Sequence, residues 1–426
     1  MKVLWLVNIV MPQLAAHLGH KATVFGGWLS GAMEAVRASN HELVICTTDP
    51  KVECNQSYSV AGITYYLTPL RSVQEMQNSF QGILEKEKPD VVHIYGTEFP
   101  HSVSMFHAAG PDRTVVTIQG SMIYYKDNVY AGLQERLCRD TRLHKLLRTL
   151  HCGGDSIELQ KKRYEERAVY ETEVLRHATY INGGSEWGNA VGRSVNPDCI
   201  TFDCKLILRD SFYDGPRWSL DRCEPHSIYV LHSYPIKGFH KFLEALPIVV
   251  RKYPDTKVYV VSSKLRYRNY SGLKAKVMDA APDYDWLIQK QIESHHLQKH
   301  LVSLGRLEEA EVKETMLKCH VYVSPSSIEN QSTTLGEAMI LGVPSVASCV
   351  GAIQEMISDG TDGFLYPFHE PYILANQILR IFDNPELAQQ FSERGHAHAA
   401  STYNRERNGE NLIHMYEAIN ARAKEK

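Results

Sequence analysis

Short apolar segments of strand length alternate with helical patterns along this chain, in two successive series. The first series comprises residues 3–7, 43–46, 91–95, 114–118 and 180–182, and the second comprises residues 228–231, 257–261, 301–304 and 320–323. Strands that alternate with helices in this way form parallel sheets that helices cover on both faces. The pattern therefore predicts an α/β chain with two Rossmann-like domains.

The length of the chain agrees with this organisation. Its 426 residues suffice for two domains of about 200 residues, each with a substantial core. We place the first domain at residues 1–206 and the second at residues 226–403. The polar, proline-bearing segment 207–225 is the expected linker. A last helical pattern covers residues 404–426.

The composition is ordinary for a globular protein, with 43% hydrophobic and 22% charged residues. A net charge of −3 gives no reason to expect nucleic-acid binding. Nine cysteines without a Cys-x-x-Cys pair indicate reduced thiols in a cytoplasmic protein. We expect the apolar N-terminus to be a buried strand and not a signal peptide, and no stretch has the apolar length of a membrane span.

Two carboxylates, Glu329 and Glu337, have seven residues between them in a stretch that predicts strand, loop and helix. In open α/β sheets, ligands bind beyond the carboxyl ends of the strands, where the N–H groups of a helix N-terminus favour phosphate. Lys237 follows another predicted strand and precedes Gly238. Each residue also has a simpler explanation when it is considered alone. Glu337 could be a solvated helical acid, Glu329 a loop charge and Lys237 a solvated turn lysine.

Four sequence elements occur in a fixed order: Lys237-Gly238, Gly305-Arg306-Leu307, the pair Glu329 and Glu337, and Gly351 followed by the run 359–365. In that order they resemble family 4 of the retaining glycosyltransferases, which use sugar nucleotides and have the two-domain GT-B fold. Gly26-Gly27, residues 90–96 and residues 117–120 match the family more loosely. The resemblance implies that the two domains face each other across a cleft and that the last helix returns to the first domain.

The resemblance also implies roles for single residues. Lys237 is expected to contact the diphosphate of the donor, Glu329 the donor sugar and Glu337 the nucleotide ribose. The remaining donor-binding candidates are Gly27, His232, Gly238, Arg306, Asn330, Ser332, Thr333, Thr334 and Leu335. His232 stands where the family usually has arginine, so it supplies a less certain positive charge and no guanidinium fork.

Four residues of the first domain are candidates for the acceptor side of the cleft: Gly26, His93, Glu98 and Gln119. Gln119 stands where many relatives carry histidine, and it cannot titrate. His93 has an equally good alternative as a core histidine. Asp359 and Asp362 fit a turn before a strand at 364–366 better than a metal site, so we expect no catalytic metal and no cofactor beside the donor, most readily a UDP-sugar.

The segment 133–151 combines a stripe of leucines with five basic residues and predicts an amphipathic helix. Such a helix can lie on an anionic membrane, which would suit a lipid-linked acceptor. The alternative is an ordinary surface helix whose leucines face the core.

The sequence thus favours a metal-independent, retaining hexosyltransferase that moves a sugar from a nucleotide diphosphate to a hydroxyl of a saccharide acceptor, in the synthesis of a bacterial surface polysaccharide. We expect it in the cytoplasm, with peripheral attachment to the inner face of the membrane as an option. A nucleotide-sugar 2-epimerase and a non-catalytic saccharide-binding subunit are the alternatives. An epimerase should need acid–base residues at the sugar, and a binding subunit would explain His232 and Gln119.

Overall fold

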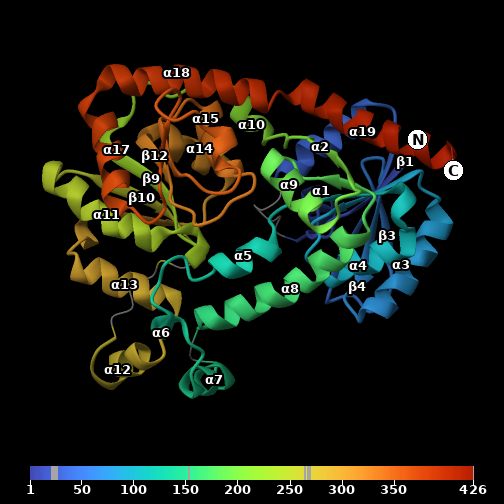
Figure 1. Cartoon of the computed structure of the whole chain (residues 1–426), viewed down its shortest axis with the longest axis horizontal. Coiled ribbons are helices and arrows are strands. Elements are labelled where there is room, and N and C mark those ends of the chain that lie inside the picture. Colours follow the sequence, from blue (N-terminus) through green and yellow to red (C-terminus); the bar gives the residue numbers. More distant parts are fainter. Residues whose placement is uncertain (21–26, 152–153, 263–264, 266–269, 426) are drawn as a thin grey trace. The chain divides into compact units, whose positions relative to one another are not determined.

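The computed structural model describes residues 1–20, 27–151, 154–262, 265 and 270–425 (Figure 1). By its contacts the chain forms two compact units. The first contains Met1–Ile123, Glu166–Asp210 and Thr402–Lys426, and the second contains Tyr124–Glu165 and Ser211–Ser401. Each unit has a mostly or wholly parallel sheet with helices, so the predicted α/β fold with two Rossmann-like domains is confirmed.

The first unit is built on a sheet with the strand order β3-β4-β2-β1-β5-β6-β7-β8. Its strands are β1 (Lys2–Leu6), β2 (Glu42–Asp49), β3 (Gln56–Val60), β4 (Ile63–Pro69), β5 (Val91–Tyr95), β6 (Thr114–Thr117), β7 (Tyr180–Asn182) and β8 (Ile200–Phe202). Its helices are α1 (Pro12–His17), α2 (Gly27–Ala38), α3 (Val73–Glu87), α4 (Pro100–Ala109), the 3₁₀ turn η1 (Pro111–Arg113), α9 (Glu186–Val195) and α19 (Arg405–Glu425). Among the strands that the structure describes in this sheet, only β3 runs antiparallel to its neighbour.

Side chains alternate between the two faces of β1, so they pack into two separate hydrophobic cores, one on each face of the sheet. Trp5 belongs to a cluster with residues of α2 and α19, whereas Leu4 and Leu6 belong to a cluster with residues of α3 and α4. The Trp5 indole N–H also donates to the Tyr416 hydroxyl of α19 at 3.0 Å. The C-terminal helix is therefore an integral part of the first unit.

The second unit is built on a wholly parallel sheet with the order β11-β10-β9-β12-β13-β14. Its strands are β9 (Glu224–Leu231), β10 (Lys257–Val261), β11 (Leu301–Gly305), β12 (Cys319–Ser324), β13 (Ser345–Ser348) and β14 (Phe364–Tyr366). Its helices and 3₁₀ turns include α6 (Glu135–Cys138), α7 (Arg142–Thr149), η2 (Pro235–Lys237), α11 (Phe239–Lys252), α12 (Gly272–Ala280), α13 (Tyr284–Ser294), η3 (Gln298–His300), α14 (Glu309–Lys318), α15 (Thr333–Ile340), α16 (Ile353–Met356), α17 (Pro371–Asp383) and α18 (Pro385–Thr402). Among the helices of the described residues, α5 (Met122–Asn128), α8 (Ile157–His177) and α10 (Asp210–Tyr213) contain a unit boundary, and so does α18 at its last residue, Thr402.

Residues 124–165, which the sequence analysis places in the first domain, belong by their contacts to the second unit. The Tyr125 hydroxyl accepts the Asn330 N–H at 3.2 Å, and the carbonyl of Ala131 accepts a bond from His240 Nε2 at 2.7 Å. His144 Nε2 donates to the carbonyl of Pro282 at 3.2 Å. Because these bonds join residues more than a hundred positions apart, the local sequence carries no trace of them.

The prediction of a single amphipathic helix over residues 133–151 is wrong. The structure has two short helices there, α6 and α7, because Arg139 is extended and Thr141 caps a new helix by accepting the His144 N–H. Arg148 pairs with Asp140 at 2.7 Å, which neutralises part of the basic face. Leu146 and Leu150 are nonetheless 54% and 61% exposed, so the leucine stripe does not face the core as a whole.

Candidate functional site

The strand order of the second sheet reverses between β9 and β12, which are neighbours in space but not in sequence. At such a switch point the connections leave β9 and β12 toward opposite faces of the sheet and open a crevice beyond the carboxyl ends. β9 leads into the turn η2, which ends at Lys237, and β12 leads into the loop that carries Glu329. The topology therefore brings these two residues together.

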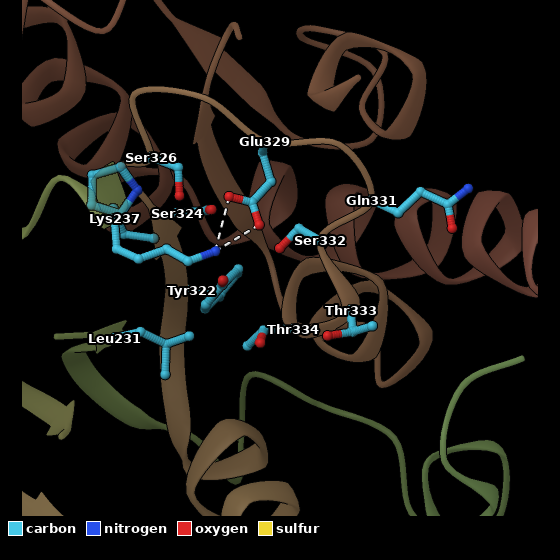
Figure 2. A pocket seen from close by; sticks show the side chains of 12 residues that line it. Leu231, Lys237, Tyr322, Ser324, Ser326, Glu329, Gln331, Ser332, Thr333 and Thr334 are labelled. Atoms are coloured by element: carbon cyan, nitrogen blue, oxygen red, sulfur yellow. Dashed lines mark hydrogen bonds and ion pairs between the residues drawn. The ribbon is translucent and has the colours of Figure 1, made fainter. Parts of the chain in front are cut away.

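Lys237 and Glu329 form a bidentate ion pair, with the ammonium 2.7 Å from one carboxylate oxygen and 2.9 Å from the other (Figure 2). The Lys237 side chain is 31% exposed and that of Glu329 is 8% exposed. An ammonium has three N–H donors, so one donor of Lys237 remains for another ligand. A half-exposed cation beside a buried carboxylate is a suitable place for the phosphate of an incoming nucleotide.

The ion pair borders a small pocket at the N-terminus of α15. Glu329, Ser332, Thr333 and Thr334 line it, and the first turn of α15 offers N–H groups to an anion. The volume of the pocket is about 70 Å³, below the range of ~300–1,000 Å³ typical of whole small-molecule sites. It thus accommodates one group of a ligand and not a complete sugar nucleotide. Glu337 lies on the same helix and is buried.

Two glycines allow the chain to approach closely around the pair. Gly238 has φ +67°, and a Cβ there would lie 1.6 Å from the carbonyl oxygen of Pro325. Gly351 has φ +51°, and a Cβ there would lie 2.0 Å from the carbonyl oxygen of Glu329. Both positions require glycine for the backbone conformation and for the space. The Lys237 turn and the Glu329 loop are therefore each held against another backbone segment.

His232 follows β9 but is not among the residues that line the pocket. It is buried, its Nδ1 lies 2.7 Å from the Ser262 hydroxyl, and its Nε2 lies 3.6 Å from the Asp285 carboxylate. The ring stacks on Tyr284 with 5.6 Å between the centroids. The histidine that replaces the family's arginine is thus held by a hydroxyl, a carboxylate and an aromatic ring.

The other donor-side candidates are scattered. Arg306 follows β11, which β10 separates from β9, and it does not line the pocket. Asn330 and Leu335 are buried beside the pocket without lining it. Gly27 begins α2 in the first unit, where a Cβ would lie 2.6 Å from the Arg209 side chain.

The structure adds pocket residues that the sequence analysis does not single out. Tyr322 and Ser324 lie at the end of β12, Ser326 follows this strand, and Gln331 lies two residues after Glu329. Figure 2 shows the Gln331 amide pointing away from the Lys237–Glu329 pair. The two serines reach the pocket because β12 pairs with β9. This pairing joins distant parts of the chain, so no local sequence pattern indicates it.

In the first unit, two acceptor-side candidates meet at the carboxyl end of the sheet. A Cβ on Gly96, after β5, would lie 3.1 Å from a carboxylate oxygen of Glu98 and 3.4 Å from the amide oxygen of Gln119. Asn8, after β1, donates to that amide oxygen at 3.1 Å. Within the described residues, the Glu98 Oε2 and Gln119 Nε2 atoms are buried and have no hydrogen-bond partner. Gly26 lies outside the described residues.

His93 is fully buried, and both of its ring nitrogens are engaged inside the first unit. Its Nδ1 lies 2.7 Å from the Tyr416 hydroxyl and its Nε2 lies 2.6 Å from the Thr117 hydroxyl. Burial lowers the pKa of its imidazole to about 3. This placement argues against contact with an acceptor, and His93 instead ties α19 to the sheet.

Glu98 and Glu171 form a buried acidic pair in the first unit. Burial raises the pKa of Glu98 to about 7 and that of Glu171 to about 8, and the Glu98 charge contributes to the second shift. The Glu171 carboxyl accepts the Ile123 N–H at 2.8 Å and a hydroxyl hydrogen bond from Thr97 at 3.3 Å. Near neutral pH Glu171 is therefore largely protonated, whereas Glu98 is about half protonated.

We predict that this pair makes the fold less stable as the pH rises. In the unfolded chain a Glu ionises near pH ~4.3, whereas in the fold Glu171 keeps its proton until about pH 8, so the native state binds more protons between these values. The stability that protonated Glu171 contributes is complete below the unfolded pKa and is lost as the pH rises toward the folded pKa. Glu171→Gln should remove this loss of stability, which is on the order of 5 kcal/mol across the interval. Urea unfolding at several pH values measures it, and an unchanged slope would contradict the assignment.

Within the described residues, no group of three or more His, Cys, Asp or Glu side chains is arranged to hold a metal ion. None of the helices in the described part of the chain is long and apolar enough to cross a membrane.

Residues 218–398 match the family model of the group 1 glycosyl transferases, and this stretch contains Lys237, Glu329 and Glu337. Phosphatidyl-myo-inositol mannosyltransferase from Mycobacterium tuberculosis is 27% identical to the chain over 217 residues, which cover 49% of this chain and 52% of that protein. The match thus spans about half the length of that relative.

Solved structures share the fold of the whole chain. Sucrose-phosphate synthase from Thermosynechococcus elongatus superimposes with a TM-score of 0.70 at 17% identity and covers 99% of both chains. Anabaena HepE in complex with UDP-glucose superimposes with a TM-score of 0.66 at 14% identity and covers 98% of this chain and all of the other. These neighbours are GT-B glycosyltransferases, so the predicted GT-B fold is confirmed.

Proposed function

We propose that this chain is a retaining, metal-independent hexosyltransferase of family 4, which moves a hexose from a nucleotide-diphosphate sugar to a hydroxyl of a saccharide acceptor. One observation carries the proposal: the Lys237–Glu329 pair stands at the switch point of a group 1 glycosyltransferase domain, beside the N-terminus of α15. A cation and free backbone donors there suit the diphosphate, whose charge grows as the glycosidic bond breaks.

In the proposed complex, Lys237 and the first N–H groups of α15 hold the diphosphate. Ser332, Thr333 and Thr334 offer hydroxyls to phosphate or sugar oxygens. Glu337 accepts the ribose hydroxyls, and Glu329 holds the donor sugar while it fixes the Lys237 ammonium. His232 contributes a charge only when it is protonated. A UDP-sugar is the donor we expect first, because solved neighbours of this fold include HepE with UDP-glucose.

The proposed reaction proceeds on one face of the sugar. The acceptor oxygen bonds to the anomeric carbon, the bond from that carbon to the diphosphate oxygen breaks, and the acceptor proton passes to the leaving phosphate. No side chain has to act as a nucleophile, so positioning and charge stabilisation by Lys237 supply most of the rate.

A lipid-linked acceptor and a role in bacterial surface polysaccharide synthesis belong to the same proposal, as does a cytoplasmic enzyme with peripheral membrane contact. The exposed Leu146 and Leu150 are the residues of segment 133–151 that support such contact. Leu146 lies on α7 and Leu150 is its C-cap residue. Because α7 is only about two turns long, the contact rests on fewer residues than a continuous helix would provide.

Transfer with retention is tested by incubating the purified chain with UDP-, GDP- or ADP-sugars and simple saccharides in the presence of a chelator. NMR of the product should show the anomeric configuration of the donor, and the rate should be the same with and without chelator. An inverted product would contradict retention, and a rate lost to the chelator would contradict metal independence. Epimerised donor without transfer would favour the epimerase.

A further inference from the structure

A second and larger hollow lies in the second unit, on the other side of the Glu329 loop. We call it the insert groove: it is lined by residues of α5 and the chain that follows it, by Ser327 after β12, by Cys349 and Val350 after β13, and by the segment 367–369 after β14. Its volume is about 440 Å³, within the range of ~300–1,000 Å³ found for small-molecule sites. The group 1 domain provides one wall, and the segment 124–165 provides the other.

The wall formed by the segment 124–165 is fixed in place. The Ser327 hydroxyl donates to the carbonyl of Asn128 at 3.2 Å, and His240 donates to the carbonyl of Ala131 at 2.7 Å. Gly132 has φ +78°, and a Cβ there would lie 3.3 Å from the His369 ring. The bond to Ala131 is buried and the bond to Asn128 is partly buried, so the second unit holds this wall in place and the groove is preformed.

The insert groove adjoins the proposed reaction centre within the same unit. Ser327 lines the groove and Ser326 lines the Lys237 pocket, so the loop that carries Glu329 separates the two hollows. On its far side Gly351, next to Val350 of the groove, touches the backbone of Glu329. A molecule in the groove would therefore lie beside the residue that is proposed to hold the donor sugar.

The side chains of the groove suit a hydroxyl-rich ring. The Asp127 carboxylate and the His369 imidazole are exposed at its rim and can bond hydroxyls, and Asn128 adds an amide. Tyr130 and Phe368 supply aromatic surface for the C–H faces of a ring. We infer that the insert groove binds the saccharide acceptor, an inference that rests on the proposed transferase function.

Asp127→Asn and His369→Ala test this inference in the full chain. Each should raise the KM for the saccharide acceptor about tenfold, the cost of one hydrogen bond with a charged or titratable partner, while the rise in melting temperature with donor stays the same. Lys126→Ala, next to Asp127 on α5 but outside the groove, is the matched control. An unchanged KM for the acceptor in both variants would overturn the inference. An equal rise in this KM in the Lys126→Ala control would also overturn it.

A second readout does not depend on transfer. Cys349 is an exposed free thiol in the groove, and Cys54 is an exposed free thiol in the first unit. Methyl glycosides of glucose, mannose, galactose and N-acetylglucosamine, added at high concentration, should slow alkylation of Cys349 by iodoacetamide and leave Cys54 unchanged, as read by mass spectrometry. Protection of Cys349 in a chain without transferase activity would refute the proposed function but keep the groove as a saccharide site. Transfer without protection would place the acceptor elsewhere.

Discussion

Replacement of Lys237 by methionine should lower the rate of transfer by about 10²–10³-fold, the effect of removing one preorganised donor from a developing negative charge. Methionine keeps the length of the side chain and removes the charge. It also leaves the Glu329 carboxylate buried without its ion-pair partner, so the variant should lose stability as well, by on the order of 3 kcal/mol. Steady-state kinetics and urea unfolding measure the two effects.

Two comparisons separate these effects. Glu329→Gln leaves a half-exposed lysine, so it should lower transfer strongly with a much smaller loss of stability. Lys252→Met on α11 removes an exposed lysine that pairs with Asp383 at 2.6 Å, and it should change neither quantity appreciably. Full transfer activity in both Lys237→Met and Glu329→Gln would contradict the site.

Gly238→Ala should disrupt the site more severely than its chemistry suggests. The new Cβ would lie 1.6 Å from the Pro325 carbonyl oxygen at a φ of +67°, so the Lys237 turn and the end of β12 would have to separate. We expect a loss of about 3–5 kcal/mol in unfolding free energy, together with loss of donor binding.

Gly272→Ala is a matched control for this prediction. Gly272 has a similar φ of +60°, but a Cβ there would meet nothing within 4 Å. Its substitution should cost only about 1 kcal/mol, the penalty for the left-handed conformation alone. Urea unfolding of both variants gives the difference in unfolding free energy. Equal losses of unfolding free energy in the two variants would show that the contact with Pro325 does not contribute to the effect.

The regular elements of the fold could be predicted because their signal is local. All nine apolar segments of the two series are strands in the structure. Most of them are buried and therefore apolar over their own length, and the exception is β11 at the sheet edge. Four further strands, β3, β4, β8 and β13, are not among the predicted segments. β3 alternates exposed and half-buried residues at the sheet edge, and β8 has three residues, none of them fully buried, so neither has a distinct apolar signal.

The site was predictable in its residues but not in its geometry. The order of four sequence elements indicated Lys237, Glu329 and Glu337, yet the ion pair joins residues 92 positions apart and depends on β9 lying next to β12. For His93, the sequence suggested a role but could not show the hydrogen-bond partners of its ring. Its position at a strand end suggested a ligand contact, and only the position of Tyr416 in the fold reveals that its nitrogens are engaged.

The prediction of one continuous helix over segment 133–151 is wrong for a third reason. Its leucines and basic residues have helical spacing, but Thr141 offers a capping hydroxyl in the middle and Asp140 takes Arg148 as a partner. A local side-chain hydrogen bond of this kind competes with continuation of the helix.

The most direct test of the account is thermal unfolding of the purified chain with a panel of UDP-, GDP- and ADP-sugars, because a ligand that binds the native state raises its stability by mass action. We predict that one class of sugar nucleotide raises the melting temperature and that Glu337→Ala and Lys237→Met each abolish the rise. A rise that survives in both variants would place the donor elsewhere, and the absence of any rise across the panel would contradict a sugar-nucleotide site at the β9–β12 switch point.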